Sequence, residues 1–394
     1  MPCVVGAALF EAACLGGPLT AQFKSAAAFG SSSTDQLGAP FTVQGVSGIV
    51  WNGPQLGGSG TDYLAVMDNS NKLVRLSVTL TADGSISSAS LAGGVSIAES
   101  RDFEDVCSRG PARDRIFVCD EGGPDIREFD LSTGGLVGVL PRPGVFANRR
   151  ANFGYESLSL SRTGSTLWTC NEEALTVDGN ASSATAGSWV RLLKYDATVS
   201  PPQPVAQYAY LTQPLHGVSV SGSRSGVSQV VVLPNRKLLV LERSFALGSS
   251  FFLTRLYEVD VSAATDVSGM GSLAAATYVP ATKRLLYSGD QTNLEGLCLG
   301  PALAAGGYAL IGIVDDGDPI SVNRVVSFRL TGDVDSPCPA DLTDDGIVDD
   351  ADFVRFAASY DLLLDPVGDL NQNGATDDDD FVLFAGAYDA LVCP

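Results

Sequence analysis

The segment FEDVCSRGPARDRIFVCDEGGPDIREFDL, residues 103–131, decides the fold because its pattern recurs along the chain. A short acidic and apolar run opens the segment, a second apolar run ends in acidic residues, and a third ends in a turn. Short runs bounded by Gly, Asp, Asn and Pro are typical of strands and too short for helices. The segment therefore predicts three neighbouring antiparallel strands.

Four more copies of this unit follow the same plan, at a spacing of roughly 50–70 residues. The five copies open at residues 47–50, 103–106, 155–158, 227–233 and 294–297. Repetition of a three- to four-stranded unit is typical of the blades of a β-propeller. The sequence predicts a mainly β chain, a β-propeller with five readable blades. A sixth could be hidden in 197–226 or 262–290, and FTVQ at 41–44 is expected to close the ring.

The domain boundaries follow from the repeat. An N-terminal segment, 1–40, could be the remnant of an export signal, although it lacks a basic start. The propeller is predicted at 41–331 and a linker at 332–340. A small α-helical module follows at 341–394.

Negative charge is concentrated at the C-terminus. The chain has 394 residues and a net charge of −21, and residues 338–394, with fourteen aspartates and one arginine, carry −13 of it. A field of this sign disfavours nucleic acid and anionic membrane surfaces as partners and favours cations. No membrane span is visible in the sequence.

The eight cysteines suggest two disulfides. Cys338 and Cys393 bracket the tail as a staple would, and Cys107 and Cys119 could pair across a hairpin. Reduced, buried thiols are the alternative for each pair. The remaining four have no evident partner: Cys3, Cys14, Cys170 and Cys298. This usage favours an oxidising compartment, so the protein is expected to be secreted, either extracellular or periplasmic.

Acidic residues recur at one end of each predicted blade. The start of the innermost strand and the end of the second lie on the same face, because the two strands are antiparallel. Carboxylates or amides stand there in the copies: Asp68, Asn69, Glu104, Asp120, Glu121, Glu156, Asn171, Glu172, Glu173, Glu242, Glu295, Asp315 and Asp316. Crowded carboxylates repel one another, and calcium prefers such oxygen ligands. The alternative is a set of solvated turn residues.

The chemistry expected at this rim is calcium-assisted. Glu104, Glu156 and Glu295 are candidate calcium ligands, Glu156 and Glu295 candidate general bases, and Arg243 a candidate phosphate contact. The chain has one histidine, His216, which excludes a histidine-rich zinc site and phosphatase chemistry based on two histidines.

The motifs DFEDV, NFGYESLSLS, LLVLERSF, NLEGL and IVDDGD, over about residues 41–330, resemble the phytase-like family known as "esterase-like activity of phytase". The resemblance implies a usually secreted propeller that hydrolyses a small phosphoester or ester. Two positions depart from the family pattern: Asp105 replaces a glycine, and Gly317 replaces an asparagine. Two alternatives remain open, a non-enzymatic calcium-dependent binding propeller and a calcium-dependent lactonase.

The tail contains two twelve-residue loops, at 341–352 and 369–380, with the ligand spacing of EF-hand calcium loops. Their predicted ligands are Asp341, Thr343, Asp345, Ile347, Asp349 and Asp352, then Asp369, Asn371, Asn373, Ala375, Asp377 and Asp380. Position 12 is Asp in both loops, and neither loop has an evident entering helix. These features resemble the duplicated calcium module of type I dockerins, which implies calcium-dependent folding and a cohesin-like or cell-surface partner.

Overall fold

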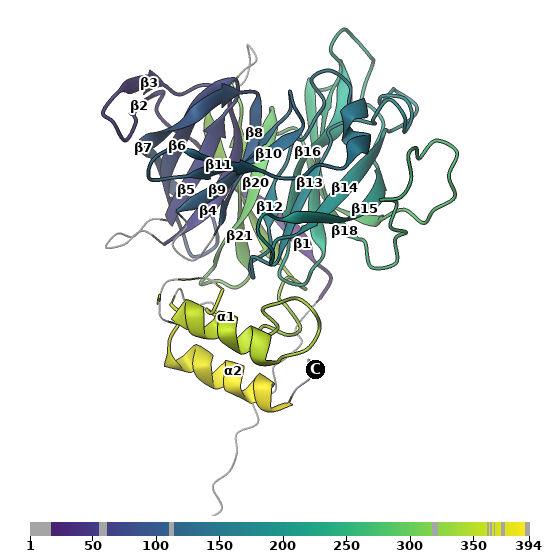
Figure 1. The fold of residues 1–394 in the computed structure, drawn as a ribbon. Coiled ribbons are helices and arrows are strands. Elements are labelled where there is room, and N and C mark those ends of the chain that lie inside the picture. The colour runs from purple at the N-terminus through teal and green to yellow at the C-terminus, as the bar shows by residue number, and fades with distance from the viewer. Residues whose placement is uncertain are drawn as a thin grey trace, which may run out of the picture.

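Five four-stranded sheets surround a common axis in the described part of the chain (Figure 1). The computed structural model describes residues 17–54, 61–109, 114–316, 322–360, 362, 365, 367–371 and 375–390. Each sheet is a propeller blade whose strands are antiparallel to their neighbours. The prediction of a five-bladed propeller is confirmed.

Each blade takes its strands from one stretch of sequence, apart from one strand of the fifth. The first blade has β4 (Val46–Pro54), β5 (Thr61–Met67), β6 (Ser70–Leu80) and β7 (Ile86–Arg101). The second has β8 (Phe103–Arg109), β9 (Arg115–Asp120), β10 (Asp125–Asp130) and β11 (Leu136–Val139). The third has β12 (Ser159–Leu160), β13 (Thr166–Cys170), β14 (Trp189–Asp196) and β15 (Gln203–Leu211). The fourth has β16 (Arg224–Val232), β17 (Leu238–Phe245), β18 (Phe252–Asp260) and β19 (Thr282–Gly289). The fifth has β20 (Leu294–Ala302), β21 (Tyr308–Val314), β22 (Arg324–Thr331) and β1 (Thr20–Ala28).

The ring is closed by β1, which pairs antiparallel with β22 as the outer strand of the fifth blade. The prediction that residues 41–44 close the ring was wrong. Residues 41–42 belong to β3 (Pro40–Thr42), which forms a hairpin with β2 (Ser32–Thr34). The propeller thus begins inside the segment that the sequence assigned to an N-terminal extension.

No sixth blade occurs among the described residues. The stretch 197–226 supplies β15 and the start of β16, and 262–290 supplies a long loop and β19. Between β11 and β12 the chain adds a short 3₁₀ helix, η1 (Gly144–Asn148). All of these belong to the five blades or to the connections between them.

The core lies between neighbouring blades. Five of the clusters of buried apolar side chains in the described residues fill the five interfaces between blades. The second strand of each blade is covered on both faces, so it reads as a continuous apolar run. All seven residues of β21, for example, are buried. The innermost strands contact one another in the ring order β4, β8, β12, β16, β20 and back to β4, which defines the axial channel.

The hairpin disulfide prediction was wrong, because Cys107 and Cys119 are both free thiols in the core. In the register of β8 and β9, Cys107 lies opposite Phe117, and Cys119 lies opposite Asp105. The two cysteines are therefore diagonal neighbours, roughly 7–8 Å apart. A disulfide needs Cβ atoms about 3.8 Å apart.

Four of the remaining cysteines were left without a predicted partner, and the structure describes only Cys338 of the predicted tail disulfide. Cys170 and Cys298 are also free and buried. Cys338 is disulfide-bonded. Cys3, Cys14 and Cys393 lie outside the described residues, so the pairing of Cys338 with Cys393 stays a prediction.

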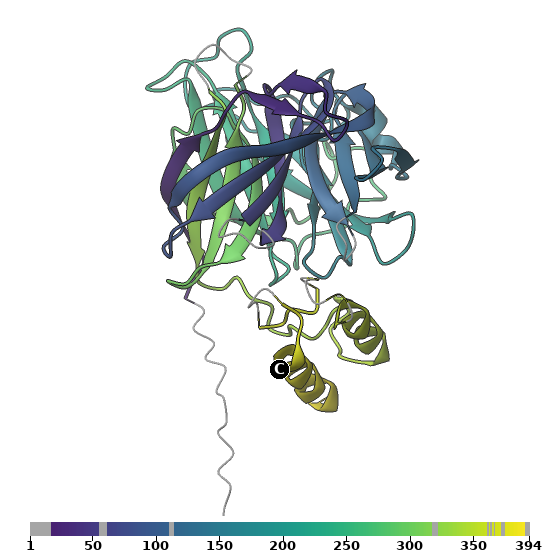
Figure 2. The same cartoon turned by 90° about the vertical axis from the view of Figure 1, so that its left-hand side faces the viewer.

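The C-terminal residues form a separate small unit at one end of the propeller (Figures 1 and 2). Its helices are α1 (Asp350–Tyr360) and α2 (Asp378–Ala390). The rings of Phe356 and Phe384 stack at 4.8 Å between centroids. The two tyrosine hydroxyls bond reciprocally, Tyr360 to Asp378 and Tyr388 to Asp350. The unit is thus a duplicated loop and helix. None of the described helices is long and apolar enough to cross a bilayer.

Candidate functional site

An extra residue in the innermost strand marks the same position in the blades. The β4–β5 ladder skips Ser47, the β8–β9 ladder skips Glu104, and the β20–β21 ladder skips Glu295. The fourth blade skips Ser228 in the same way. In the third blade, Glu156 follows an isolated bridge between Tyr155 and Asn171. Bulges bend a strand and redirect its side chains, and they are frequent next to active sites.

The bulge side chains meet at the axis. The Ser47 hydroxyl lies 2.6 Å from Oε2 of Glu104 and 3.0 Å from Oε2 of Glu295, so it bridges the second and fifth blades. Three consecutive blades therefore present their bulge residues to one point. Burial of Glu104 and Glu156, each about 8% exposed, shows that these carboxylates are held inside the channel mouth.

Two carboxylate triads form at this mouth. The first consists of Asp68, Asp102 and Glu104, and the second of Glu121, Glu156 and Glu172. Within each triad, one oxygen from every residue lies within 4.8 Å of the others. Carboxylate oxygens at this spacing could contact one hard cation such as calcium.

The charge of the triads is poorly compensated inside the protein. Burial raises the pKa of Asp68 to about 7 and that of Glu121 to about 8, and neighbouring carboxylates add to each shift. Burial, together with the other acidic groups, also holds the pKa values of Glu104 and Glu156 well above their usual range. Like charges in a desolvated site resist ionisation unless a cation joins them.

Two arginines border the second triad. Nη2 of Arg243 lies 3.3 Å from Oε1 of Glu172, and its Nη1 donates to Oδ1 of Asn293 at 2.9 Å. The same Nη1 contacts Glu295. Nε of Arg224 lies 3.1 Å from Oε1 of Glu172. Glu295 is thus neutralised by Arg243, which explains why it stands outside both triads.

Other predicted rim residues bond elsewhere. Asp120 pairs with Arg101 on the outer side, and the Glu173 carboxylate accepts from Ser182. Glu242 accepts from Tyr210, the amide of Gln213, and Lys283, and so faces the outer strands β15 of the third blade and β19 of its own blade. Near the fifth blade, Asp315 accepts from Asn293, and Asp316 accepts from the Gly45 amide and from Asn323. Within the third blade, Oδ1 of Asn171 accepts from the Arg191 amide.

The middle of the channel is closed by Asp105, which stands where the family pattern has a glycine. Its Oδ2 accepts from the Leu158 amide at 2.6 Å and from Nε2 of Gln229 at 2.6 Å. It thereby ties β8 to the third and fourth blades. A Cβ on Gly48 would stand 2.3 Å from Oδ1 of Asp105, so the backbone there must be glycine. The acidic mouth does not run through to the other end.

His216 lies away from both triads. Its Nδ1 is 2.9 Å from the Ser244 hydroxyl and its Nε2 is 3.0 Å from the Ser250 carbonyl oxygen. Ser244 is fully buried. Because a carbonyl, not a carboxylate, meets the second ring nitrogen, these contacts link two chain segments and do not form a triad.

The tail loops are closed by their last residues. Asp352 is fully buried and accepts from the amides of Leu342 at 2.7 Å, Thr343 at 2.8 Å and Asp349 at 2.9 Å. Asp380 repeats this at the amides of Asn371 and Asp377, at 2.9 and 3.0 Å.

The first ligand position of each loop is bound to its surroundings. Asp341 accepts from the amides of Asp345 and Gly346, at 3.1 and 2.9 Å, and it also contacts Arg236 of the propeller. Asp369 receives Arg162 at its carbonyl oxygen. Asn373 lies outside the described residues. Asp352 and Asp380 thus each close their loop, and the calcium-ligand roles of the loop residues stay predictions.

Sequence reasoning missed three members of the rim. Ser47 occupies the position that Glu holds in the second, third and fifth copies, so the alignment of the repeats contained that signal. Arg224 opens the fourth inner strand, which the sequence marked only from residue 227. Asp102 was seen as part of a family motif but not as a ligand.

Comparisons with known proteins agree with the propeller. The family model described as "Phytase-like: Esterase-like activity of phytase" matches residues 42–318. No curated protein matches the chain. Two of the solved structures that are similar to the chain are hydrazine synthase of Kuenenia stuttgartiensis (11% identity, TM-score 0.34, 72% of this chain and 64% of that one) and a luciferin-regenerating enzyme (12% identity, TM-score 0.34, 74% and 94%). Such distant likeness carries no argument about function. The family match extends over most of the chain, and the protein therefore belongs to the phytase-like family.

Proposed function

We propose that this protein is a calcium-assisted hydrolase of small phosphoesters or esters, with its active site at the acidic mouth of the propeller. The observation that carries the proposal is the pair of carboxylate triads gathered around the inner-strand residues Glu104 and Glu156; the second triad is buried and the first is partly buried. Membership of the phytase-like family supports an esterase-like hydrolase. The two triads supply the hard oxygen ligands that calcium needs.

In this proposal the six carboxylates of the two triads bind calcium. Asp68, Asp102 and Glu104 would hold one calcium, and Glu121, Glu156 and Glu172 a second. Bound calcium would neutralise the carboxylates and polarise a phosphoryl or carbonyl oxygen of the substrate.

Substrate binding and proton transfer fall to neighbouring groups. Arg224 is about one-third exposed, so its guanidinium can reach an anionic substrate. Arg243 is buried and held by three partners, so it positions Glu172 and Glu295 and does not reach outward. Glu156, which would lie beside the second ion, would also accept the proton of the attacking water.

The test is turnover of phytate and of p-nitrophenyl phosphate and acetate with and without calcium. We expect calcium-dependent turnover in the wild type and a loss of about 100-fold or more in Glu156→Gln. Glu258→Gln is the matched control, because Glu258 lies on β18 and pairs with Lys237 and Arg284 away from the mouth. Full activity of Glu156→Gln, or activity that survives chelation, would contradict the proposal.

The assay also distinguishes the alternatives. Turnover of lactones alone would assign a lactonase. No turnover on any substrate, combined with a calcium-dependent rise in melting temperature, would assign a binding propeller.

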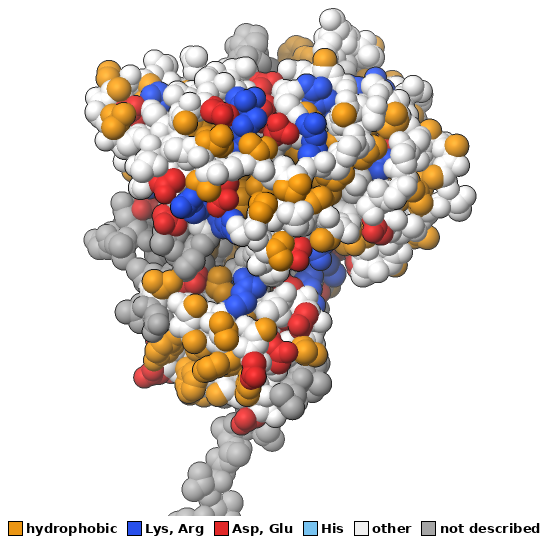
Figure 3. All heavy atoms as spheres, viewed as in Figure 1, with side chains coloured by type: hydrophobic (Ala, Val, Ile, Leu, Met, Phe, Trp, Pro, Cys, Tyr) orange, Lys and Arg blue, Asp and Glu red, His pale blue; other side chains and the backbone are white. Residues whose placement is uncertain are grey.

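We also propose that the C-terminal unit is a dockerin-like calcium module. The reciprocal tyrosine contacts and the two buried closing aspartates support a duplicated calcium-loop unit. Apolar side chains gather over its two helices (Figure 3). They include the half-exposed Phe353, Val354, Phe381 and Val382, which would form a docking face for a cohesin-like or cell-surface partner.

A further test concerns the ion stoichiometry of this module. Calorimetry of the full chain should lose one calcium site in Asp352→Asn and one in Asp380→Asn. An unchanged stoichiometry in both variants would rule the module out as a calcium site. Export to an oxidising compartment remains a prediction, supported here only by the disulfide-bonded state of Cys338.

A further inference from the structure

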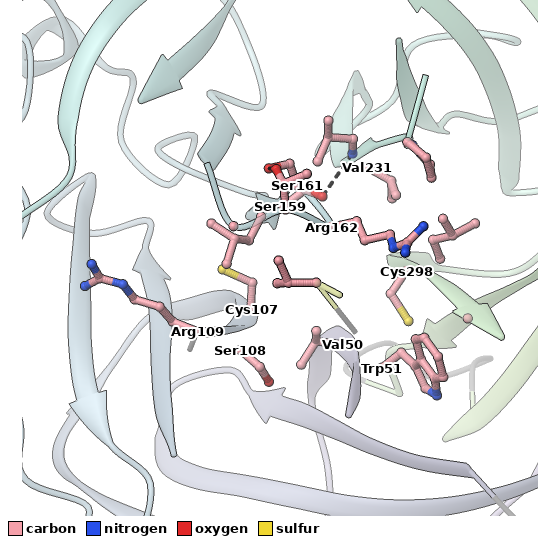
Figure 4. Close-up of a pocket in the computed structure, with 18 of the residues that line it drawn as sticks. Val50, Trp51, Cys107, Ser108, Arg109, Ser159, Ser161, Arg162, Val231 and Cys298 are labelled. Carbon is pink, nitrogen blue, oxygen red and sulfur yellow. Dashed lines mark hydrogen bonds between the residues drawn. The ribbon is translucent and has the colours of Figure 1, made fainter. Parts of the chain in front are cut away.

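The end of the axial channel opposite the acidic mouth holds a cavity of about 580 Å³. All five innermost strands, or the turns that follow them, contribute to its wall. The wall is largely apolar and includes Leu160, together with Val50, Trp51, Val231 and Cys298, which are labelled in Figure 4. Its volume lies in the range of about 300–1,000 Å³ that is typical of sites for small molecules.

This cavity is separate from the acidic mouth. Asp105 and Gln229 join across the channel between them, and Gly48 packs directly against Asp105. A molecule in the cavity therefore cannot reach the carboxylate triads, so the cavity requires a ligand of its own.

The C-terminal module closes the cavity from below. Arg355 and Ala358 of α1, together with Asp365, Val367 and Asp369 from the following segment, belong to its lining. The module is held there by bonds to the β12–β13 turn. Arg355 donates to the Thr163 carbonyl, and the Thr163 hydroxyl donates to Oδ2 of Asp344 at 2.6 Å.

Two guanidinium groups and two carboxylates lie at this closed end, those of Arg162, Arg355, Asp365 and Asp369. The guanidinium groups of Arg162 and Arg355 both line the cavity, and burial lowers the pKa of each. Nη1 of Arg355 is buried and has no hydrogen-bond partner among the described residues. A guanidinium remains charged in proteins, so a buried donor of this kind favours an acceptor that carries negative charge.

The other charged groups of the lining are engaged. Arg109 forms an ion pair with Oε1 of Glu128 at 3.0 Å, and in Figure 4 its side chain extends away from the labelled cavity residues. The Asp365 carboxylate accepts from the amide of Val367 at 3.2 Å. Asp369 is the first ligand of the second predicted calcium loop. The unpaired Nη1 of Arg355 thus stands out as the donor that a ligand could take.

We propose that this cavity binds an amphipathic monocarboxylic acid of the fatty-acid class, with its chain among the apolar inner-strand residues and its carboxylate at Arg355 and Arg162. The module serves as the floor of the site. The ligand chemistry follows from an apolar chamber that ends in guanidinium groups, one of which has an unused donor.

The test is displacement of dansyl-labelled undecanoic acid from the full-length protein in the presence of calcium. Dodecanoic acid should displace the probe at one site per chain, and dodecanol should bind about tenfold more weakly or worse, because it lacks the charge that the arginines recognise. This comparison needs no variant. Equal affinity for the acid and the alcohol, or no saturable binding of the probe, would overturn the proposal.

Three variants locate the site. Arg355→Gln should weaken binding of the acid about tenfold with little effect on the alcohol, whereas Arg115→Gln, the matched control at an arginine outside the cavity lining, should leave both unchanged. Leu160→Trp should fill the chamber and abolish binding of both. If a folded Leu160→Trp protein, checked by circular dichroism, still binds the acid with wild-type affinity, the site lies elsewhere and the proposal fails.

Discussion

Replacement of Asp105 by alanine tests the closure of the axial channel. The Asp105 side chain is fully buried and accepts two hydrogen bonds from other blades, from the Leu158 amide and from Nε2 of Gln229, both at 2.6 Å. Alanine removes the acceptor and leaves both donors behind in a site that water does not reach.

The expected loss follows from those two donors. A buried donor without a partner costs about 1–3 kcal/mol, so Asp105→Ala should lower the free energy of unfolding by about 2–6 kcal/mol. Asparagine offers an instructive comparison, because its single carbonyl oxygen can take the place of Oδ2 and keep both bonds between blades. The bond from the Val106 amide at 2.8 Å, which alanine loses as well, is then lost. Asp105→Asn should therefore cost about 1 kcal/mol.

Urea denaturation, followed by tryptophan fluorescence, measures both variants against the wild type. We expect the midpoint to fall strongly for alanine and slightly for asparagine, with the same slope for all three proteins. An alanine variant as stable as the wild type would refute the closure of the channel by Asp105. Equal losses for the two variants would refute the assignment of the effect to the bonds between blades.

Three further predictions concern the acidic mouth, the module and the channel. In calcium-free buffer, the carboxyl group of Glu121, whose pKa is raised to about 8 in the folded protein, binds more protons in the folded state than in the unfolded state. The melting temperature should therefore fall as pH rises from about 5 to 8, and added calcium should restore it most at pH 8; a melting temperature that rises over this range would contradict the shift. Arg236→Gln should raise the calcium affinity of the first tail loop in calorimetry, because it removes a cation that contacts Asp341; weaker binding would exclude competition. Gly48→Ala should lower the melting temperature by several degrees, since its Cβ would stand 2.3 Å from Oδ1 of Asp105, and an unchanged value would show that the channel can widen.

Much of the propeller could be predicted because the inner and second strands of each blade carry strong signals. Strands covered on both faces are continuous apolar runs, and β21 is an example. The outer strands carry weaker signals. The closing strand β1 (TAQFKSAAA) and the fourth strand β15 (QPVAQYAYL) are partly exposed and mix small, polar and apolar residues, and β11 (LVGV) is short and mostly exposed, so no pattern marked them.

The candidate site could be predicted in position but not in its pairing. The bulge residues Glu104 and Glu156 were found because an acidic residue at the start of an inner strand is unusual for a turn. The orientation of Glu242 was not, because its partners Tyr210 and Lys283 come from distant parts of the sequence. The neutralisation of Glu295 by Arg243 depends on the packing of the fourth blade against the fifth, which no local pattern records.

The most direct test of the central claim is a crystal structure of the full chain grown with calcium. The account predicts ion density between Glu121, Glu156 and Glu172, with oxygen ligands about 2.3–2.6 Å from the ion. The tail loops are the internal control for calcium in the crystal. Density at Asp341 and Asp369 with none at the second triad would contradict a calcium site at the mouth of the propeller.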